Sequence, residues 1–324
     1  MRMIILYTVA FMLFCYGNIV GQTCCSAGAP LTSTFQITHE DQKVLNLQLK
    51  YTYRSINRLV ENQEVLVNDP RTRFGNNLLL KGDYSINKKI ALSLVVPYVF
   101  QSRTTTSEEQ SSRGIGDVLL VGQYQQKIKK DYSLSYSVGA KLPTGKVDHL
   151  SDRGVFLSPD MQSGSGTFDF LFGVNLGKKH FIKKNVSFGA SLLYRRNTTN
   201  DTFGETSTSS GRSFKFGDDF LADVTLSHQQ LWGVWFATPY VNLQYRNSQA
   251  NIEEESESPN SGGQWLSAQA GLQFVPKQNF NIKLYGQVPF YQSLQGTQIT
   301  TDYEIGIEIN HKLQFEKKKL PIAP

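Results

Sequence analysis

The sequence predicts an all-β fold, a transmembrane, antiparallel, up-and-down β-barrel of about 12 strands. Three observations lead to this prediction. Apolar and polar residues alternate along many segments, the connections between them alternate between short turns and long polar loops, and aromatic residues recur near the segment ends. Short periplasmic turns, long extracellular loops and girdles of aromatic residues are typical of outer-membrane barrels.

The alternation is clearest in residues 132–142, where every second residue is Tyr, Leu, Val or Ala and the intervening residues are mostly Ser, Gly and Lys. Residues 168–176 repeat the pattern with Phe, Val and Leu on one side. A period of two indicates a strand with one apolar and one polar face, and about ten residues cross a bilayer. Because the polar faces carry full charges, we expect lipid outside and water inside.

The first 22 residues predict an export signal. Arg2 precedes an apolar run from Met3 to Tyr16, and small or polar residues follow. This run is too short for a transmembrane helix and has the layout of a cleaved signal peptide. The expected organisation is a signal peptide (1–22), an N-terminal segment that is a plug or a periplasmic tail (23–42), an outer-membrane β-barrel (43–315) and a C-terminal tail (316–324).

The strand pattern recurs twelve times after the N-terminal segment. An even number of strands places both termini on the periplasmic side. The composition, with 40% hydrophobic and only 19% charged residues, fits a polar interior better than a large dry core. The expected strands are 43–55, 74–86, 90–101, 114–127, 132–144, 165–176, 185–196, 213–227, 233–246, 263–275, 280–291 and 298–312.

Asp218 does not follow the expected faces. The alternation along 213–227 puts its carboxylate on the lipid side, where a charge at the bilayer midplane is costly. A β-bulge at Gly217, or a position above the membrane, would remove the conflict.

Cys24 and Cys25 are the only cysteines expected in the mature chain, because Cys15 leaves with the signal peptide. Adjacent cysteines can form a strained disulfide or bind a soft metal, and lipid attachment at Cys24 is a further alternative. The residues before Cys24 do not match a lipid-attachment sequence, and no partner at metal-ligand spacing follows. We therefore expect an ordinary thiol pair, within a plug if one forms, and no metal site or cofactor.

Inward-facing charges are the candidate functional residues. Pairing neighbouring strands from their long-loop ends places residues of alternating sign at similar heights on six strands: Asp117, Lys141, Asp169, Arg195, Asp219 and Arg246. Across the closing seam, Arg54 is expected near Asp302, and Lys50 near Glu304 or Glu308. This charged belt is either a constriction that filters solutes or a ladder of ion pairs that keeps the barrel rigid, and both roles are compatible.

Four sequence phrases, taken together, resemble a known family. They are Gly-Ile-Gly-Asp-Val-Leu-Leu at 114–120, Ala-Lys-Leu-Pro-Thr-Gly-Lys at 140–146, Ser-Gly-Ser-Gly-Thr-Phe-Asp at 163–169, and Val-Pro-Phe-Tyr-Gln followed by Gly-Thr-Gln within 288–298. Their order is similar to that in Gram-negative outer-membrane barrels named for the MetA-pathway of phenol degradation. The resemblance covers most of the chain after Leu45. It implies a barrel that passes small, hydrophobic or aromatic molecules.

Other function classes lack support in the sequence. The net charge of +6 has no basic cluster interleaved with aromatic residues, so nucleic-acid binding is not expected. The acidic run 253–257 lacks the glycine and ligand spacing of a calcium loop. No serine elbow or triad carboxylate accompanies any histidine, so we expect no catalytic residue and no enzyme; the histidines are His39, His149, His180, His228 and His311.

The expected function is therefore passive passage of small molecules through a channel in the outer membrane. The expected partners are outer-membrane lipid, a small-molecule solute and the barrel assembly machinery. A structural or adhesive barrel with partner-binding loops is the main alternative, and an outer-membrane hydrolase is a less favoured one.

Overall fold

A closed β-barrel dominates the structure, a computed structural model that describes residues 43–66, 70–106, 108–129, 131–206 and 210–315. Twelve antiparallel strands form the wall, each paired with its neighbours along the chain, and the first strand pairs with the last. The wall strands are β1 (Val44–Ser55), β4 (Thr72–Ser85), β5 (Ile90–Thr104), β7 (Val118–Lys129), β8 (Tyr132–Leu142), β9 (Asp169–Lys178), β10 (Val186–Arg196), β13 (Asp219–His228), β15 (Trp235–Ser248), β18 (Gly263–Lys277), β19 (Phe280–Leu294) and β21 (Tyr303–Gln314).

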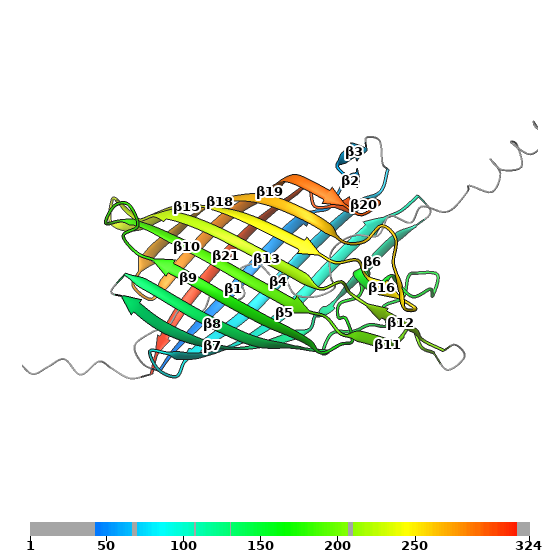
Figure 1. Cartoon of the computed structure of the whole chain (residues 1–324), viewed down its shortest axis with the longest axis horizontal. Helices are drawn as coiled ribbons and strands as arrows, with labels where there is room; N and C mark the ends of the chain where they lie inside the picture. The colour runs from blue at the N-terminus through cyan, green and yellow to red at the C-terminus, as the bar shows by residue number, and fades with distance from the viewer. Residues whose placement is uncertain (1–42, 67–69, 107, 130, 207–209, 316–324) are drawn as a thin grey trace, which may run out of the picture.

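The two ends of the barrel differ in their connections (Figure 1). Tight turns join strands at one end, with only the short β14 (Gln230–Trp232) added there. At the other end the connections contain further short strands and a 3-10 turn. These are β2 (Arg58–Glu61), β3 (Glu64–Leu66), β6 (Glu109–Ile115), η1 (Pro159–Met161), β11 (Thr199–Phe203), β12 (Arg212–Lys215), β16 (Ile252–Glu253), β17 (Ser256–Glu257) and β20 (Thr297–Thr300).

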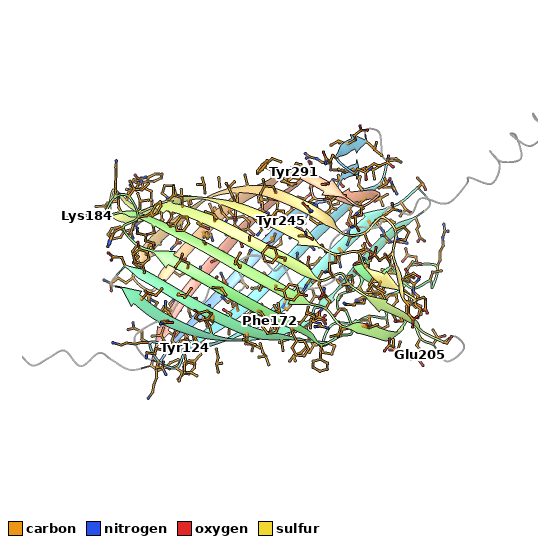
Figure 2. All side chains as sticks on the ribbon, viewed as in Figure 1. Tyr124, Phe172, Lys184, Glu205, Tyr245 and Tyr291 are labelled. Carbon is orange, nitrogen blue, oxygen red and sulfur yellow. The ribbon has the colours of Figure 1, made fainter. Side chains whose placement is uncertain are left out.

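The wall has an apolar outer face and a largely polar inner face. On β4, Leu80 and Tyr84 are exposed, whereas the alternating Lys81 and Asp83 are buried. Large apolar side chains such as Phe172 cover the outside of the barrel (Figure 2). Soluble monomers rarely expose a continuous apolar surface of this extent, whereas lipid-embedded barrels require one. The prediction of an all-β outer-membrane-type barrel is confirmed.

Four wall strands begin four to six residues later than the sequence predicts. The expected strands 114–127, 165–176, 213–227 and 298–312 are observed as β7, β9, β13 and β21, which start at 118, 169, 219 and 303. The residues before each start are rich in Gly, Ser, Thr and Asp, and they form loop contacts or separate strands instead of continuing the wall. The predicted segments 1–22, 23–42 and 316–324, with Cys24 and Cys25, lie outside the described residues.

Asp218 lies immediately before β13 and is not inside a membrane-crossing strand. Its carboxylate accepts hydrogen bonds from the Tyr194 hydroxyl at 2.8 Å and the Asn197 backbone N–H at 2.9 Å. Lys215 Nζ is 3.5 Å away. Because the carboxylate is paired beyond the end of the strand, the conflict with the lipid face does not arise.

The interior is not polar throughout, which corrects the expectation of a wholly wet lumen. One cluster of buried apolar residues comes from inward positions on β4, β5, β7, β9, β10 and β13. Its members are at most 6% exposed: Leu79, Ala91, Val95, Leu119, Val121, Leu171, Leu193 and Leu221. This half of the wall therefore has a packed inner surface. No helix in the described ranges is long and apolar enough to cross a membrane.

Candidate functional site: the charged lumen

Lys141 lies at the centre of one group of belt residues, between Asp117 and Asp169. Its ammonium lies 3.4 Å from Asp117 Oδ2 and also forms an ion pair with Asp169, its partner in the β8–β9 register. All three side chains are at most 1% exposed. Buried charges persist only when they are paired, so this arrangement depends on both carboxylates remaining beside the lysine.

Asp219 lies at the centre of a second group of belt residues, between Arg195 and Arg246. It forms an ion pair with Arg195, its register partner on β10, and Arg246 Nη2 is 2.7 Å from its other oxygen. The Arg195 and Asp219 side chains are 1% exposed, whereas Arg246 is 22% exposed. The structure thus brings the six predicted residues into two groups, of which only Arg246 offers much surface to the lumen.

Ion pairs also lie at the closing seam, where the first and last wall strands meet. Arg54 forms an ion pair with Glu304 at 2.7 Å, and Asp302 forms one with Arg58 at 2.8 Å. The proximity of Arg54 to Asp302 stays a prediction. The register places Arg54 opposite Glu304, and Asp302 immediately precedes β21. Lys50 lies opposite Glu308 in the same register.

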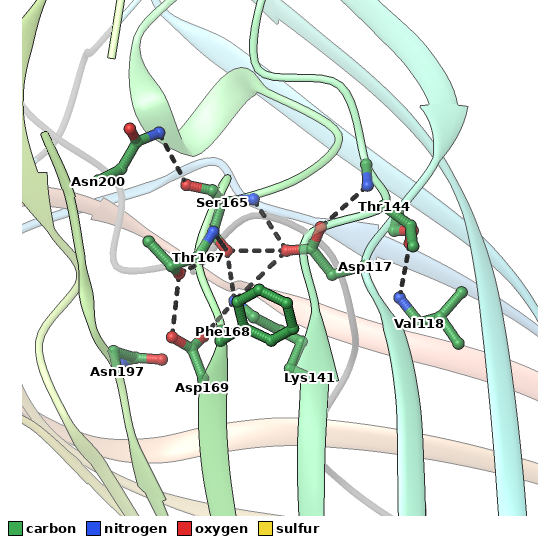
Figure 3. A network of polar contacts seen from close by, with 12 residues as sticks. Asp117, Val118, Lys141, Thr144, Ser165, Thr167, Phe168, Asp169, Asn197 and Asn200 are labelled. Atoms are coloured by element: carbon green, nitrogen blue, oxygen red, sulfur yellow. Dashed lines mark hydrogen bonds and ion pairs between the residues drawn. The ribbon is translucent and has the colours of Figure 1, made fainter. Parts of the chain in front are cut away.

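Asp117 also holds both ends of the long loop between β8 and β9 (Figure 3). One carboxylate oxygen accepts from the Gly145 N–H at 3.0 Å, and the other accepts from the N–H and the hydroxyl of Ser165 at 2.8 Å each. Gly145 and Gly164 are so close that a Cβ on either would lie 2.6 Å from the other's backbone. The Gly-x-Gly-Asp, Leu-Pro-Thr-Gly and Gly-Ser-Gly phrases therefore meet at one carboxylate.

A polar cavity of about 200 Å³ occupies the other side of the lumen. Its lining comes from β1, β13, β15, β18, β19 and β21, the strands opposite most of the apolar cluster. The lining side chains are amides, hydroxyls, tyrosines and charges, without an aliphatic side chain. The charged members are Lys50, Asp223, Lys283 and Glu308. The cavity therefore presents hydrogen-bonding groups and charges of both signs.

Two tyrosines lie flat against the cavity wall. The Tyr240 ring lies over Gly271, and the Tyr285 ring lies over Gly306. Each glycine is on the adjacent strand, directly opposite its tyrosine in the register. The absent Cβ leaves room for each ring, because a Cβ on either glycine would collide with the tyrosine. Lys283 Nζ lies 4.6 Å from the Tyr240 ring centroid, a cation–π distance. Flat rings keep the cavity open.

The sequence prediction missed most of the cavity. Lys50 and Glu308 were expected in the belt, but Asp223, Lys283 and the two tyrosines were not selected. Asp223 accepts hydrogen bonds from Gln244 at 2.9 Å and Ser191 at 3.1 Å. The alternation along the strand could have identified Asp223, because residues 219, 221 and 223 share the inward face. Asp223 lies four residues farther along β13 than Asp219, away from the long-loop end at which the belt is predicted.

The described histidines contact different partners, and His311 lies beside the Phe280 ring. His149 Nε2 lies 2.8 Å from Ser163 Oγ, and His180 Nδ1 lies 3.2 Å from Asp131. His228 contacts Asn185, and His39 lies outside the described residues. No group of three His, Cys, Asp or Glu side chains among the described residues has metal-binding geometry.

Sequence comparison identifies the family. The model of the family described as "Putative MetA-pathway of phenol degradation" matches residues 77–298, well over half of the 324-residue chain. The chain belongs to this family. The matched region of this family member contains the three phrases that meet at Asp117. No curated protein sequence matches significantly.

Solved structures show the same fold for this member of the phenol-degradation family. One is the COG4313 outer-membrane channel from Pseudomonas putida F1, with a TM-score of 0.70 and 10% identity, covering 88% of this chain and 100% of that chain. Another is the β domain of the Bordetella autotransporter BrkA, with a TM-score of 0.50 and 10% identity, covering 84% of this chain and 100% of that chain. At these identities the likeness concerns the fold.

Proposed function

We propose that this family member is an outer-membrane channel through which small molecules pass without energy coupling. The observation that supports this most directly is a closed barrel with an apolar exterior and a cavity of about 200 Å³ lined by polar groups. Water and polar solutes require such a lining, whereas a barrel with only a structural role has no need of it. The likeness to a P. putida outer-membrane channel agrees with the proposal.

The chemistry of the cavity supports a narrower class of solute. Its lining contains no aliphatic side chain, and its charges include two lysines and two carboxylates. A bare hydrocarbon would displace water from these groups without replacing the hydrogen bonds. We therefore favour small solutes with hydroxyl, carboxylate or amine groups, including hydroxylated aromatics, over purely hydrophobic molecules.

The belt has a different role in this proposal. Asp117, Lys141, Asp169, Arg195 and Asp219 are at most 1% exposed, so they offer almost no surface to a solute. We propose that they hold the wall and the loop ends in place. Selection by charge then falls to the cavity residues and to the more exposed Arg246 and Arg54.

Single-channel recording in planar bilayers tests the proposal. Stepwise currents from the purified chain, together with uptake of small polar solutes into proteoliposomes, are expected. A second sample lacking residues 23–42 tests the plug hypothesis, since a plugged barrel conducts well only after this deletion. Absence of current and of uptake in both samples would refute the channel and favour a structural or adhesive barrel.

A further inference from the structure

The long loop between β8 and β9, residues 143–168, lies inside the mouth of the barrel. Its contacts on the wall include Arg73 of β4 and Gln101 and Arg103 of β5. These three residues share the alternation of the inward-facing Leu79 and Val95 on the same strands. The loop therefore packs against the inner surface of the wall and not on the outer rim.

Asp160, in the 3-10 turn η1, is the central contact of this loop. Its carboxylate forms an ion pair with Arg73, and Arg103 Nη1 is 3.7 Å away. Arg73 also donates to the Asp160 carbonyl at 2.7 Å and to Gln101 at 2.8 Å. The Arg73 side chain is fully buried, so Asp160 neutralises a guanidinium that has no direct access to solvent.

The turn around Asp160 is buried and connected internally. Met161 and Gln162 are 0% exposed. The Gln162 side chain accepts from the His149 N–H at 2.8 Å and donates to the Leu157 carbonyl at 2.9 Å, which links the two arms of the loop. The Gln162 carbonyl accepts from Gln101 at 3.2 Å. These contacts, together with the Asp160 ion pair, hold the turn against the wall.

Both ends of the same loop are held by Asp117, as described above. The loop is thus attached at both of its ends and around Asp160, at the end of the barrel that carries the long connections. A segment held in this way occupies part of the cross-section available to a solute. Its position then determines how large a solute can enter.

We propose that residues 158–163 form the outer constriction of the channel and that Asp160 is the residue that positions it. This inference rests on the proposed function. Asp160 acts through the loop and is not itself required to touch the solute. Removing its charge leaves Arg73 buried without its carboxylate, so the turn moves away from the wall and the mouth widens.

Asp160→Asn is the direct test, with Asp152→Asn as the matched control. Both residues lie in the same loop and lose the same charge, but Asp152 is exposed. Conductance and uptake of neutral polar solutes of increasing size are measured in proteoliposomes. We expect Asp160→Asn to raise uptake of the larger solutes several-fold and to change the smallest solutes little. Uptake of large solutes equal to that of Asp152→Asn overturns the inference.

A chemical readout separates this inference from the channel proposal. In a chain with Cys24→Ser and Cys25→Ser, the buried Met161 is replaced as Met161→Cys and the rate of reaction with a membrane-impermeant maleimide is measured. Adding Asp160→Asn should accelerate labelling several-fold. An unchanged rate overturns the positioning role of Asp160 whether or not the barrel conducts. Acceleration in a barrel without current supports that positioning role and refutes the channel, and with it the constriction.

A milder variant covers the case in which Asp160→Asn does not assemble. Arg103 is 13% exposed and its nitrogen is farther from Asp160, so Arg103→Gln weakens the attachment without orphaning a fully buried charge. It should accelerate labelling at position 161 and widen the size limit to a smaller extent. No change in either measurement with a correctly folded Arg103→Gln barrel also contradicts the assigned role of the turn.

Discussion

Replacing Lys141 by alanine tests the role of the belt. Lys141 lies between Asp117 and Asp169, and it also donates to Ser165 at 2.6 Å. The substitution removes the cation and leaves two carboxylates, each at most 1% exposed, without their shared partner. Breaking a buried pair by removing one partner costs about 3–5 kcal/mol. We expect a loss of this size from the free energy of unfolding.

Urea unfolding of the detergent-folded barrel, followed by heat-modifiability on gels, measures this loss. With a denaturant slope of about 2 kcal/mol/M, the midpoint should fall by about 1.5–2.5 M. The matched control is Lys146→Ala, because Lys146 is exposed in the adjacent loop. An exposed substitution of this kind should change stability by no more than about 0.5 kcal/mol.

A double substitution makes the explanation specific. If the cost of Lys141→Ala comes from facing carboxylates, adding Asp169→Asn should recover part of the lost stability, because the two changes are coupled. A loss below about 1 kcal/mol for Lys141→Ala, or no coupling with Asp169→Asn, would refute a structural role for the belt.

Three further changes test other parts of the lumen. Asp223→Asn should shift the reversal potential toward anion selectivity, by up to about fivefold in permeability ratio, since a charge at 4 Å in water contributes about 1 kcal/mol. Gly271→Ala should push the Tyr240 ring toward the cavity, lower conductance and cost about 1–3 kcal/mol, whereas Gly286→Ala, with its nearest neighbour at 4.0 Å, should change little. Burial, partly opposed by Asp148, lowers the pKa of His149. As the pH falls, His149 is protonated in the unfolded chain at a higher pH than in the folded chain, so the free energy of unfolding should decrease below about pH 6.5. Urea titrations at several pH values measure this decrease, and His149→Gln should reduce it. An unchanged selectivity, equal effects of the two glycine variants, or a pH slope that survives His149→Gln would contradict these three predictions in turn.

The sequence alone determined the wall of the barrel. The alternation of side chains has a period of two, and in an up-and-down barrel each strand pairs with its neighbours along the chain, so strand order follows directly from chain order. The same rule placed Lys141 beside Asp169 and Arg195 beside Asp219. At the closing seam, where the two ends of the barrel sequence meet, the register places Arg54 opposite Glu304.

Only the tertiary structure decided what lies inside that wall. The contact between Arg73 and Asp160 connects residues that are 87 positions apart in the sequence. The alternation along the strands does not predict whether a polar loop folds into the barrel or away from it. The convergence of three glycine-rich phrases on Asp117 is equally non-local. The alternation predicts which side chains face the lumen. Which of these side chains contact one another across the lumen depends on the curvature and register of the closed sheet. The apolar half of the interior and the polar cavity opposite it are therefore products of closure.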